Sequence, residues 1–158
     1  MIIQEEFFGP AALDNLSTIL SQLNPKKVLV VTGGSSYISS GARSKVMPML
    51  KRFETIIFDD FEVNPKIQDV YKGVALVKGS KPDLIIAIGG GSVLDMAKIL
   101  NIISSQKIYS VLDLIINPHL ISSKNFSPLV AIPTTFGTGS EATNFACLLY
   151  TSPSPRDS

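Results

Sequence analysis

The sequence predicts an α/β fold built on an open, mostly parallel sheet. Short apolar runs, typical of buried strands, alternate along the chain with segments whose apolar residues recur at helical spacing. The most apolar run covers residues 84–88 and is followed at once by Gly89-Gly90-Gly91 and a helical pattern. Five consecutive apolar residues are typical of a strand buried on both faces, as strands of parallel sheets are. The alternation and this central run together predict the fold class.

The other elements follow the same logic in chain order. Strands are predicted over an opening stretch that ends near residue 8 and over residues 28–31, 55–58 and 129–132. Helices are predicted over residues 13–23, about 42–53, 65–77 and 93–103. Pro48 must lie in the first turn of its helix or kink it. Residues 104–127 are predicted to be mostly loop, with a helical turn at 111–114 and a solvated His119.

The glycine turn at 89–91 is predicted to open a buried helix and to bind an anion. Ser92 is expected to cap this helix, with Asp95 as the acidic partner in a capping box. A backbone without side chains, outward N–H groups and the positive end of a helix dipole would suit a phosphate. The alternative interpretation is a tight strand-to-helix turn that binds nothing.

Small polar residues or glycines follow four predicted strands. They lie at residues 33–36, at Asn64, at 89–92 and at 134–140. Ligands of an open parallel sheet bind outside the carboxyl ends of its strands, so these segments should converge on one crevice suited to a nucleotide. The Gly-x-Gly-x-x-Gly fingerprint is absent, and Asp59 and Asp60 precede the glycine turn instead of following it.

Composition argues against several classes of protein. A net charge of +1 without a basic cluster argues against a nucleic-acid partner. The single cysteine, Cys147, excludes an internal disulfide and fits a reducing compartment. The acidic start lacks the basic region of a signal peptide, and no apolar run reaches the roughly 18 residues of a membrane span. We therefore expect a cytoplasmic protein with neither a membrane nor a nucleic-acid partner.

Two motifs in order carry a family resemblance. Gly-Gly-Gly-Ser-Val-Leu-Asp-Met-Ala-Lys at 89–98 is followed by Ile-Pro-Thr-Thr-Phe-Gly-Thr-Gly-Ser-Glu-Ala-Thr at 132–143. Together they closely resemble the iron-containing (group III) alcohol dehydrogenases, as do Asn64-Pro65 and the opening Phe-Gly-Pro-x-Ala-Leu at 8–13. The resemblance covers residues 7–146 and implies a Rossmann-like domain that binds NADP or NAD.

The resemblance also implies a role for each matching residue. Gly90, Gly91 and Ser92 would cradle the cofactor pyrophosphate, and Asp95 would lie near the nicotinamide ribose. The nicotinamide half would contact Thr134, Thr135 and Thr138, whereas the adenosine half would contact Asn64. Plainer interpretations remain open: Ser92 and Asp95 could only cap their helix, Asp95 could only pair with Lys98, and Asn64 could only start a helix.

The cofactor preference is predicted from the end of the strand at 28–31. Many family members carry an aspartate there, which would hold the adenosine ribose and repel a 2′-phosphate. This sequence has Gly33, followed by the hydroxyls of Ser35 and Ser36, with Arg43 and Lys45 further on. NADP is therefore favoured over NAD, the alternative being a turn that needs only small residues.

The family holds iron or zinc with one aspartate and three histidines in a helical C-terminal domain. This sequence stops before that domain, and His119 matches none of the ligands. We interpret residues 1–146 as the cofactor-binding half of a metal-dependent alcohol dehydrogenase or aldehyde reductase. We expect this half to be inactive alone. The full-length parent is expected to be a homo-oligomer that acts on small alcohols or aldehydes. Residues 147–158 are Ser/Pro-rich and resemble translated sequencing adapter, with a genuine flexible tail as the alternative.

Two other functions stay open on the residues alone. One is a non-catalytic nucleotide-binding module that is complete as it stands. The other is a cofactor-using lyase of the dehydroquinate synthase type, which shares the glycine triplet. The Asp95-x-Ala97-Lys98 helix and the threonine- and glycine-rich turn favour the dehydrogenases over the lyases.

Overall fold

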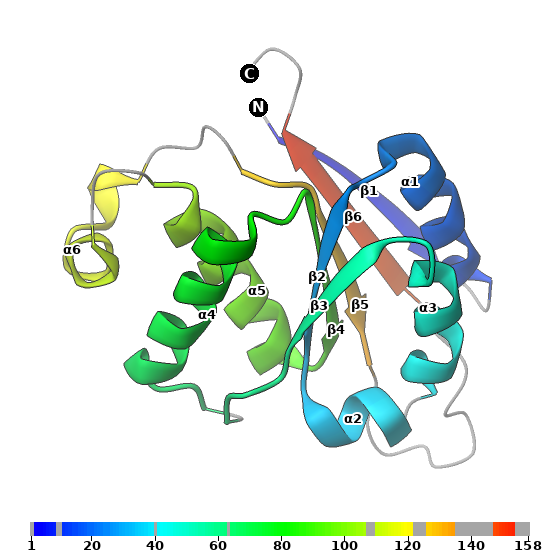
Figure 1. Cartoon of the computed structure of the whole chain (residues 1–158), viewed down its shortest axis with the longest axis horizontal. Coiled ribbons are helices and arrows are strands. Elements are labelled where there is room, and N and C mark those ends of the chain that lie inside the picture. The colour runs from blue at the N-terminus through cyan, green and yellow to red at the C-terminus, as the bar shows by residue number, and fades with distance from the viewer. Residues whose placement is uncertain are drawn as a thin grey trace.

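A six-stranded sheet forms the centre of the computed structural model, which describes residues 2–8, 11–39, 41–62, 64–106, 110–121, 126–134 and 147–153 (Figure 1). The strands are β1 (Ile2–Phe8), β2 (Lys27–Thr32), β3 (Glu54–Phe58), β4 (Leu84–Gly89), β5 (Leu129–Pro133) and β6 (Cys147–Pro153). Their order across the sheet is β1-β6-β5-β4-β2-β3. The four strands from β5 to β3 run parallel, which confirms the predicted fold class.

Helices cover both faces of this sheet. They are η1 (Ala12–Asp14), α1 (Asn15–Leu23), α2 (Gly34–Ser39), α3 (Ala42–Leu50), α4 (Ile67–Ser80), α5 (Gly91–Ser104), α6 (Val111–Ile116) and η2 (Pro118–Leu120). Helices α1, α2 and α3 lie on one side of the sheet, and α4, α5 and α6 lie on the other (Figure 1). None of the helices in the described ranges has the length and apolar character to cross a membrane.

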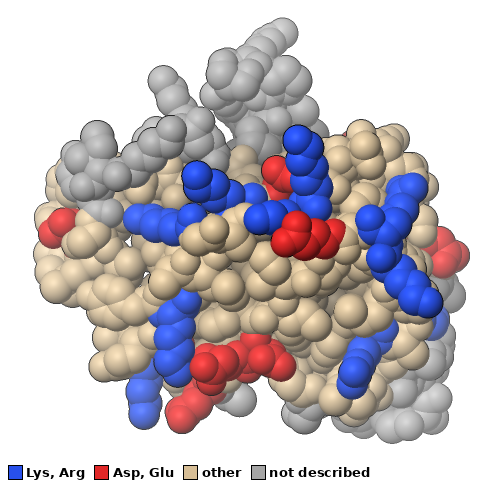
Figure 2. All heavy atoms as spheres, in the orientation of Figure 1, with Lys and Arg blue, Asp and Glu red and all other residues tan. Residues whose placement is uncertain are grey.

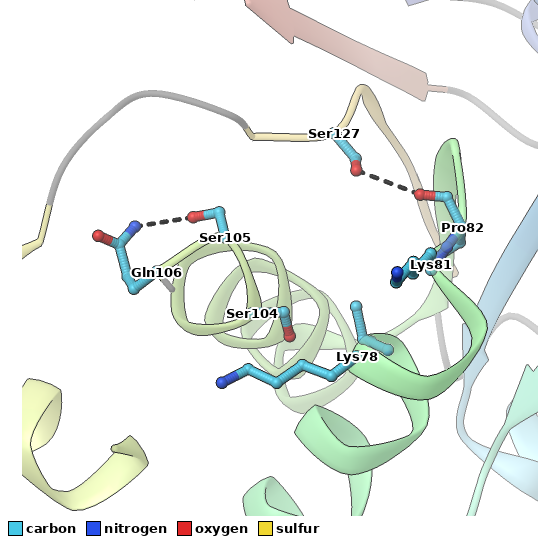
Figure 3. Close-up of a pocket in the computed structure, with 8 residues that line it drawn as sticks. Lys78, Lys81, Pro82, Ser104, Ser105, Gln106 and Ser127 are labelled. Carbon is cyan, nitrogen blue, oxygen red and sulfur yellow. Dashed lines mark hydrogen bonds between the residues drawn. The ribbon is translucent and has the colours of Figure 1, made fainter. Parts of the chain in front are cut away.

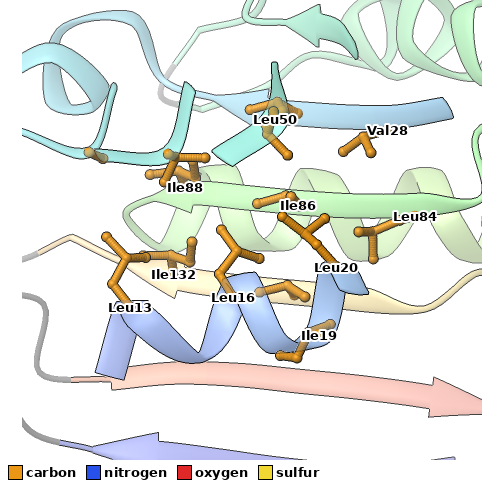
Figure 4. Close-up of a cluster of buried hydrophobic side chains, with 14 of the residues drawn as sticks. Leu13, Leu16, Ile19, Leu20, Val28, Leu50, Leu84, Ile86, Ile88 and Ile132 are labelled. Atoms are coloured by element: carbon orange, nitrogen blue, oxygen red, sulfur yellow. The ribbon is translucent and has the colours of Figure 1, made fainter. Parts of the chain in front are cut away.

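Alternate residues of the parallel strands build two separate cores. In β4, Leu84, Ile86 and Ile88 pack with α1 and α3, in the cluster drawn in Figure 4. Ile85 and Ala87 pack on the opposite face with α4 and α5. Every residue of β4 is buried, as its unbroken apolar run predicts. The sheet is thus held rigidly from both sides, and the positions at its strand ends are fixed.

Three elements differ from the sequence expectation. Helix α2 was predicted as a polar turn, because its six residues carry glycine and three serines and show no long apolar period. Pro48 lies inside α3 beyond its first turn, and the helix ends two residues later at Leu50. Helix α5 is not buried all round, since Asp95, Lys98 and Ile99 are exposed.

His119, which the sequence predicts to be solvated, lies in η2 and is exposed.

Residues 147–153, which the sequence separates from the domain as a Ser/Pro-rich tail, form a strand of the sheet. Strand β6 pairs antiparallel with β1 over its whole length and with the first part of β5. It therefore lies between β1 and the parallel strands. The domain boundary at residue 146 and the foreign origin of the segment stay predictions.

Candidate functional site

The carboxyl ends of β2, β4 and β5 lie side by side at one edge of the sheet. The register pairs Thr32 with Ile88, and Gly89 with Pro133. Gly33, Gly90 and Thr134 therefore each follow the last paired residue of their own strand. Sequence position does not bring them together; the strand order does.

The chain reverses its direction across the sheet between β2 and β4. From β2 it moves outward to β3, and from β4 it moves the opposite way to β5. The helices after β2 cover one face, whereas α4 and α5 cover the other (Figure 1). Such a switch point opens a crevice between the carboxyl ends of two neighbouring strands, where ligands of open α/β sheets bind. Gly33 and Gly90 flank this point.

Gly89 allows the tight turn from β4 to α5. Its φ is 156°, and a Cβ added to it would lie 2.7 Å from Cγ2 of Val93 in the first turn of α5. Its carbonyl oxygen accepts a hydrogen bond from the Thr134 N–H at 3.0 Å. A side chain at this position would push the helix away from the strand, so glycine is required by close approach.

Helix α5 begins at Gly91, with Gly90 as its N-cap and no side-chain cap. The predicted capping box of Ser92 and Asp95 is wrong, because the helix starts before Ser92. The first N–H groups of a helix have no partner within it, and among the described residues the Val93 N–H is the first in α5 to bond, to the Gly90 carbonyl at 3.1 Å. The N–H groups before it thus lie at the positive end of a 14-residue helix.

The turn also leaves room for a ligand. A Cβ added to Gly90 or to Gly91 would meet no heavy atom within 4 Å in the described part of the chain. Neither glycine is therefore needed for packing, in contrast to Gly89. Bare backbone beside open space at a helix N-terminus is the arrangement that binds phosphate groups.

Thr134 adds a buried hydroxyl next to this turn. The residue is 9% exposed, and its Oγ1 has no hydrogen-bond partner among the described residues. A buried hydroxyl without a partner costs about 1–3 kcal/mol of stability. A ligand in the crevice would supply that partner. The family motif predicts this threonine as a site residue, and the structure places it beside Gly89.

At the end of β2, the chain passes through Gly33 into α2. The Gly33 carbonyl accepts a hydrogen bond from the Tyr37 N–H at 3.1 Å. Tyr37 is 5% exposed and its hydroxyl has no partner among the described residues. Burial raises the pKa of this hydroxyl above its ordinary value, and the nearby Arg43 charge partly opposes the shift. The sequence does not predict a role for Tyr37, because its pattern does not predict α2.

The remaining predicted site residues are less well placed. Asn64 is exposed and does not cap α4, because that cap is Lys66, whose N–H donates to Asp69 Oδ2 at 2.9 Å. Asp95 is exposed on α5. The backbone of Ser35 and Ser36 lies in α2, and nothing is described of their side chains. Thr135 and Thr138 lie outside the described residues.

The glycine turn and Thr134 offer groups that suit an organic phosphate, whereas the described residues offer no cluster of metal ligands. The open cradle at Gly90 and Gly91 and the unpartnered Thr134 hydroxyl suit a phosphate-bearing ligand with further polar groups. No group of three or more His, Cys, Asp or Glu residues within the described ranges could hold a metal. The chemistry of a metal therefore cannot be assigned to this part of the chain.

Comparison with known proteins decides the family. The profile of the iron-containing alcohol dehydrogenases matches residues 4–154. The chain belongs to this family. The match extends past the 7–146 covered by the sequence motifs and includes β6.

Relatives with named activities match most of the chain. A 1,3-propanediol dehydrogenase of Klebsiella pneumoniae is 34% identical over an alignment of 152 residues that covers 92% of this chain and 38% of that enzyme. An NADPH-dependent butanol dehydrogenase of Clostridium saccharobutylicum is 33% identical over an alignment of 145 residues that covers 90% of this chain and 36% of that enzyme. The chain thus spans well under half the length of these relatives.

Solved structures agree with the observed fold. An iron-containing alcohol dehydrogenase of Thermotoga maritima matches with a TM-score of 0.70 and 36% identity, covering 85% of this chain and 37% of that one. A sulfoacetaldehyde reductase of Bifidobacterium kashiwanohense, solved with NAD⁺, matches with a TM-score of 0.70 and 25% identity, covering 86% and 35%. The Rossmann-like α/β sheet is therefore the fold of the family's first part.

Proposed function

We propose that this chain is the cofactor-binding part of a metal-dependent, NAD(P)-linked alcohol dehydrogenase or aldehyde reductase. The observation that carries the proposal is the open cradle at Gly90 and Gly91 beside the buried, unpartnered hydroxyl of Thr134. A relative solved with NAD⁺ and another that is NADPH-dependent support the class of cofactor. When bound, the nicotinamide would supply the hydride chemistry.

The chain's own residues would bind and orient that cofactor. The N–H groups at the start of α5 would donate to the pyrophosphate, and the absence of side chains at Gly90 and Gly91 would let it approach the backbone. Thr134 Oγ1 would give its hydrogen bond to the nicotinamide half. The carboxyl end of β2, at Gly33, would receive the adenosine ribose.

We also propose a preference for NADP over NAD. Gly33 brings no carboxylate to the end of β2, and the exposed Arg43 and Lys45 lie in α3, which follows α2. Nothing at Gly33 would repel a 2′-phosphate, and the two cations would attract one.

The experiment that tests cofactor binding and preference is a fluorescence titration of the chain with NADPH and NADH. Binding of NADPH should be the tighter of the two, and Gly33→Asp should shift the preference towards NADH, because the new carboxylate repels the 2′-phosphate. Equal binding before and after the substitution would refute the role of Gly33. Failure to bind either nucleotide would refute the proposed function itself.

The substrate would be a small alcohol or aldehyde, as the names of the relatives suggest. Because the described residues offer no metal site, we propose that this chain alone does not turn such substrates over. An assay with a panel of small alcohols, NAD(P) and added iron(II) or zinc checks this. Metal-dependent reduction of the nucleotide above background would contradict it.

A further inference from the structure

A second pocket lies at the end of the sheet opposite the glycine turn. It has a volume of ≈520 Å³ and is formed where α4 and α5 end and where β4 and β5 begin (Figure 3). This volume is within the range of about 300–1,000 Å³ typical of small-molecule sites. Nothing in the proposed dehydrogenase function uses it.

One wall of the pocket is fixed by hydrogen bonds. The Asn101 side chain donates to the Ser127 carbonyl at 2.9 Å and accepts from the Ser127 N–H at 3.0 Å. The Ser127 hydroxyl in turn donates to the Pro82 carbonyl at 3.4 Å (Figure 3). These bonds join the C-terminal part of α5 to the residues that precede β4 and β5, so this wall of the pocket does not depend on the rotamer of one side chain.

Helix C-termini would ordinarily make such a place attractive to cations. Here, however, several carbonyls near the two helix ends already have donors. In α4, Lys81 N–H and Ser80 Oγ donate to the carbonyls of Val77 and Leu76. In α5, the Ile102 carbonyl accepts from both Ser105 Oγ and Gln106 Nε2, at 2.6 and 3.0 Å. These carbonyls are therefore less available to a cation.

The donors that remain favour an anion. Lys78 and Lys81 line the pocket and are exposed, and the described residues that line it include no aspartate or glutamate. Ser104 Oγ is buried in this wall and has no hydrogen-bond partner among the described residues. Figure 3 shows Lys78 extending past Ser104 from the neighbouring helix. In the same orientation as Figure 1, Lys and Arg side chains lie over the part of the surface where α4 and α5 end, with some Asp and Glu side chains among them (Figure 2).

We propose that this pocket binds a small oxyanion, held by the ammonium groups of Lys78 and Lys81 and by the hydroxyl of Ser104. The anion could carry a phosphoryl or a carboxylate group, since both accept charge-assisted hydrogen bonds from lysine. The site is independent of the glycine turn, because it lies at the other end of α5.

The test is a residue-resolved NMR titration of the 158-residue chain with inorganic phosphate and, separately, with succinate, at matched ionic strength in chloride. We expect saturable shifts of the amides of Ser104, Ser105 and Gln106 with at least one probe. Saturation by phosphate alone would identify a phosphoryl ligand, and saturation by succinate a carboxylate ligand. Shifts at Gly90 and Gly91 report the glycine turn and separate this proposal from the cofactor site.

Variants decide whether the named side chains are responsible. The double substitution Lys78→Gln and Lys81→Gln should weaken binding at the pocket by at least about tenfold, and Ser104→Ala should weaken it by several fold. Lys51→Gln, which removes an exposed charge next to α3 on the other side of the sheet, should leave it unchanged. An unsaturable response to both probes, or equal affinity in the double variant, would overturn the proposal.

Discussion

The backbone N–H of Thr134 donates a hydrogen bond to the carbonyl oxygen of Gly89, with an N···O distance of 3.0 Å. This bond joins the carboxyl ends of β5 and β4, from the residue just after the last paired residue of β5 to the last paired residue of β4. It holds the Thr134 side chain at the edge of the sheet where α5 begins. The hydroxyl of that side chain is left buried without a partner in the described part of the chain.

We predict that Thr134→Val does not destabilise the chain without cofactor. Valine has the shape of threonine and removes a buried hydroxyl that lacks a partner, so the free energy of unfolding should stay the same or rise by about 1 kcal/mol. Cofactor affinity should fall by about threefold to tenfold, because the ligand loses one hydrogen bond. Urea unfolding and NADPH titration measure the two effects.

Thr32→Val is the matched control for this prediction. Thr32 is also buried, at the end of β2, but its hydroxyl donates to the Gly33 carbonyl at 3.3 Å. Its loss should lower the free energy of unfolding by about 1 kcal/mol. If Thr134→Val destabilised the chain as much as Thr32→Val does, the Thr134 hydroxyl would have to be satisfied without a ligand.

Gly89→Ala should destabilise the chain. The new Cβ would lie 2.7 Å from Val93 Cγ2 at a backbone conformation that disfavours side chains, at a cost of about 1–3 kcal/mol. Gly79→Ala is the control, because a Cβ there meets nothing within 4 Å inside α4, and it should raise stability by about 0.5–1 kcal/mol. Thermal unfolding distinguishes them, and equal melting temperatures would mean that β4 and α5 do not pack this closely.

The central part of the fold could be predicted from sequence because its signals are local. The apolar run of β4 and the glycines after it are adjacent in the chain, and both fall where the sequence places them. The capping of α5 by Ser92 was wrong because a glycine N-cap leaves no side-chain signal. The Thr134 contact with Gly89 and the insertion of β6 beside β5 depend on strand order, which no local pattern encodes.

Tyr37 gives a prediction for alkaline pH. Burial raises the pKa of its hydroxyl in the folded chain, so the unfolded chain loses this proton at a lower pH than the folded chain does. Stability from this group is fully present below the unfolded pKa of about 10 and is lost as pH rises through the higher folded value. Tyr37→Phe should therefore lose less stability than the parent chain above about pH 10.

Urea unfolding of both chains from neutral to alkaline pH measures that difference. Tyr71→Phe is the control, because it removes a phenolic hydroxyl from a side chain that is 43% exposed. Identical pH profiles for Tyr37→Phe and the parent chain would show that the Tyr37 hydroxyl ionises as readily in the folded chain as in the unfolded one.

The proposed function depends on the glycine turn binding the cofactor pyrophosphate, and NADPH titration of Gly91→Val tests this most directly. A Cβ at Gly91 meets no described atom within 4 Å, so the variant should fold normally while blocking the approach of the phosphates. Gly79→Val, equally free of contacts in α4, controls for the valine. We predict affinity at least about tenfold lower in Gly91→Val and unchanged in Gly79→Val. A folded Gly91→Val chain that binds NADPH as the parent chain does would contradict binding of the pyrophosphate at the glycine turn.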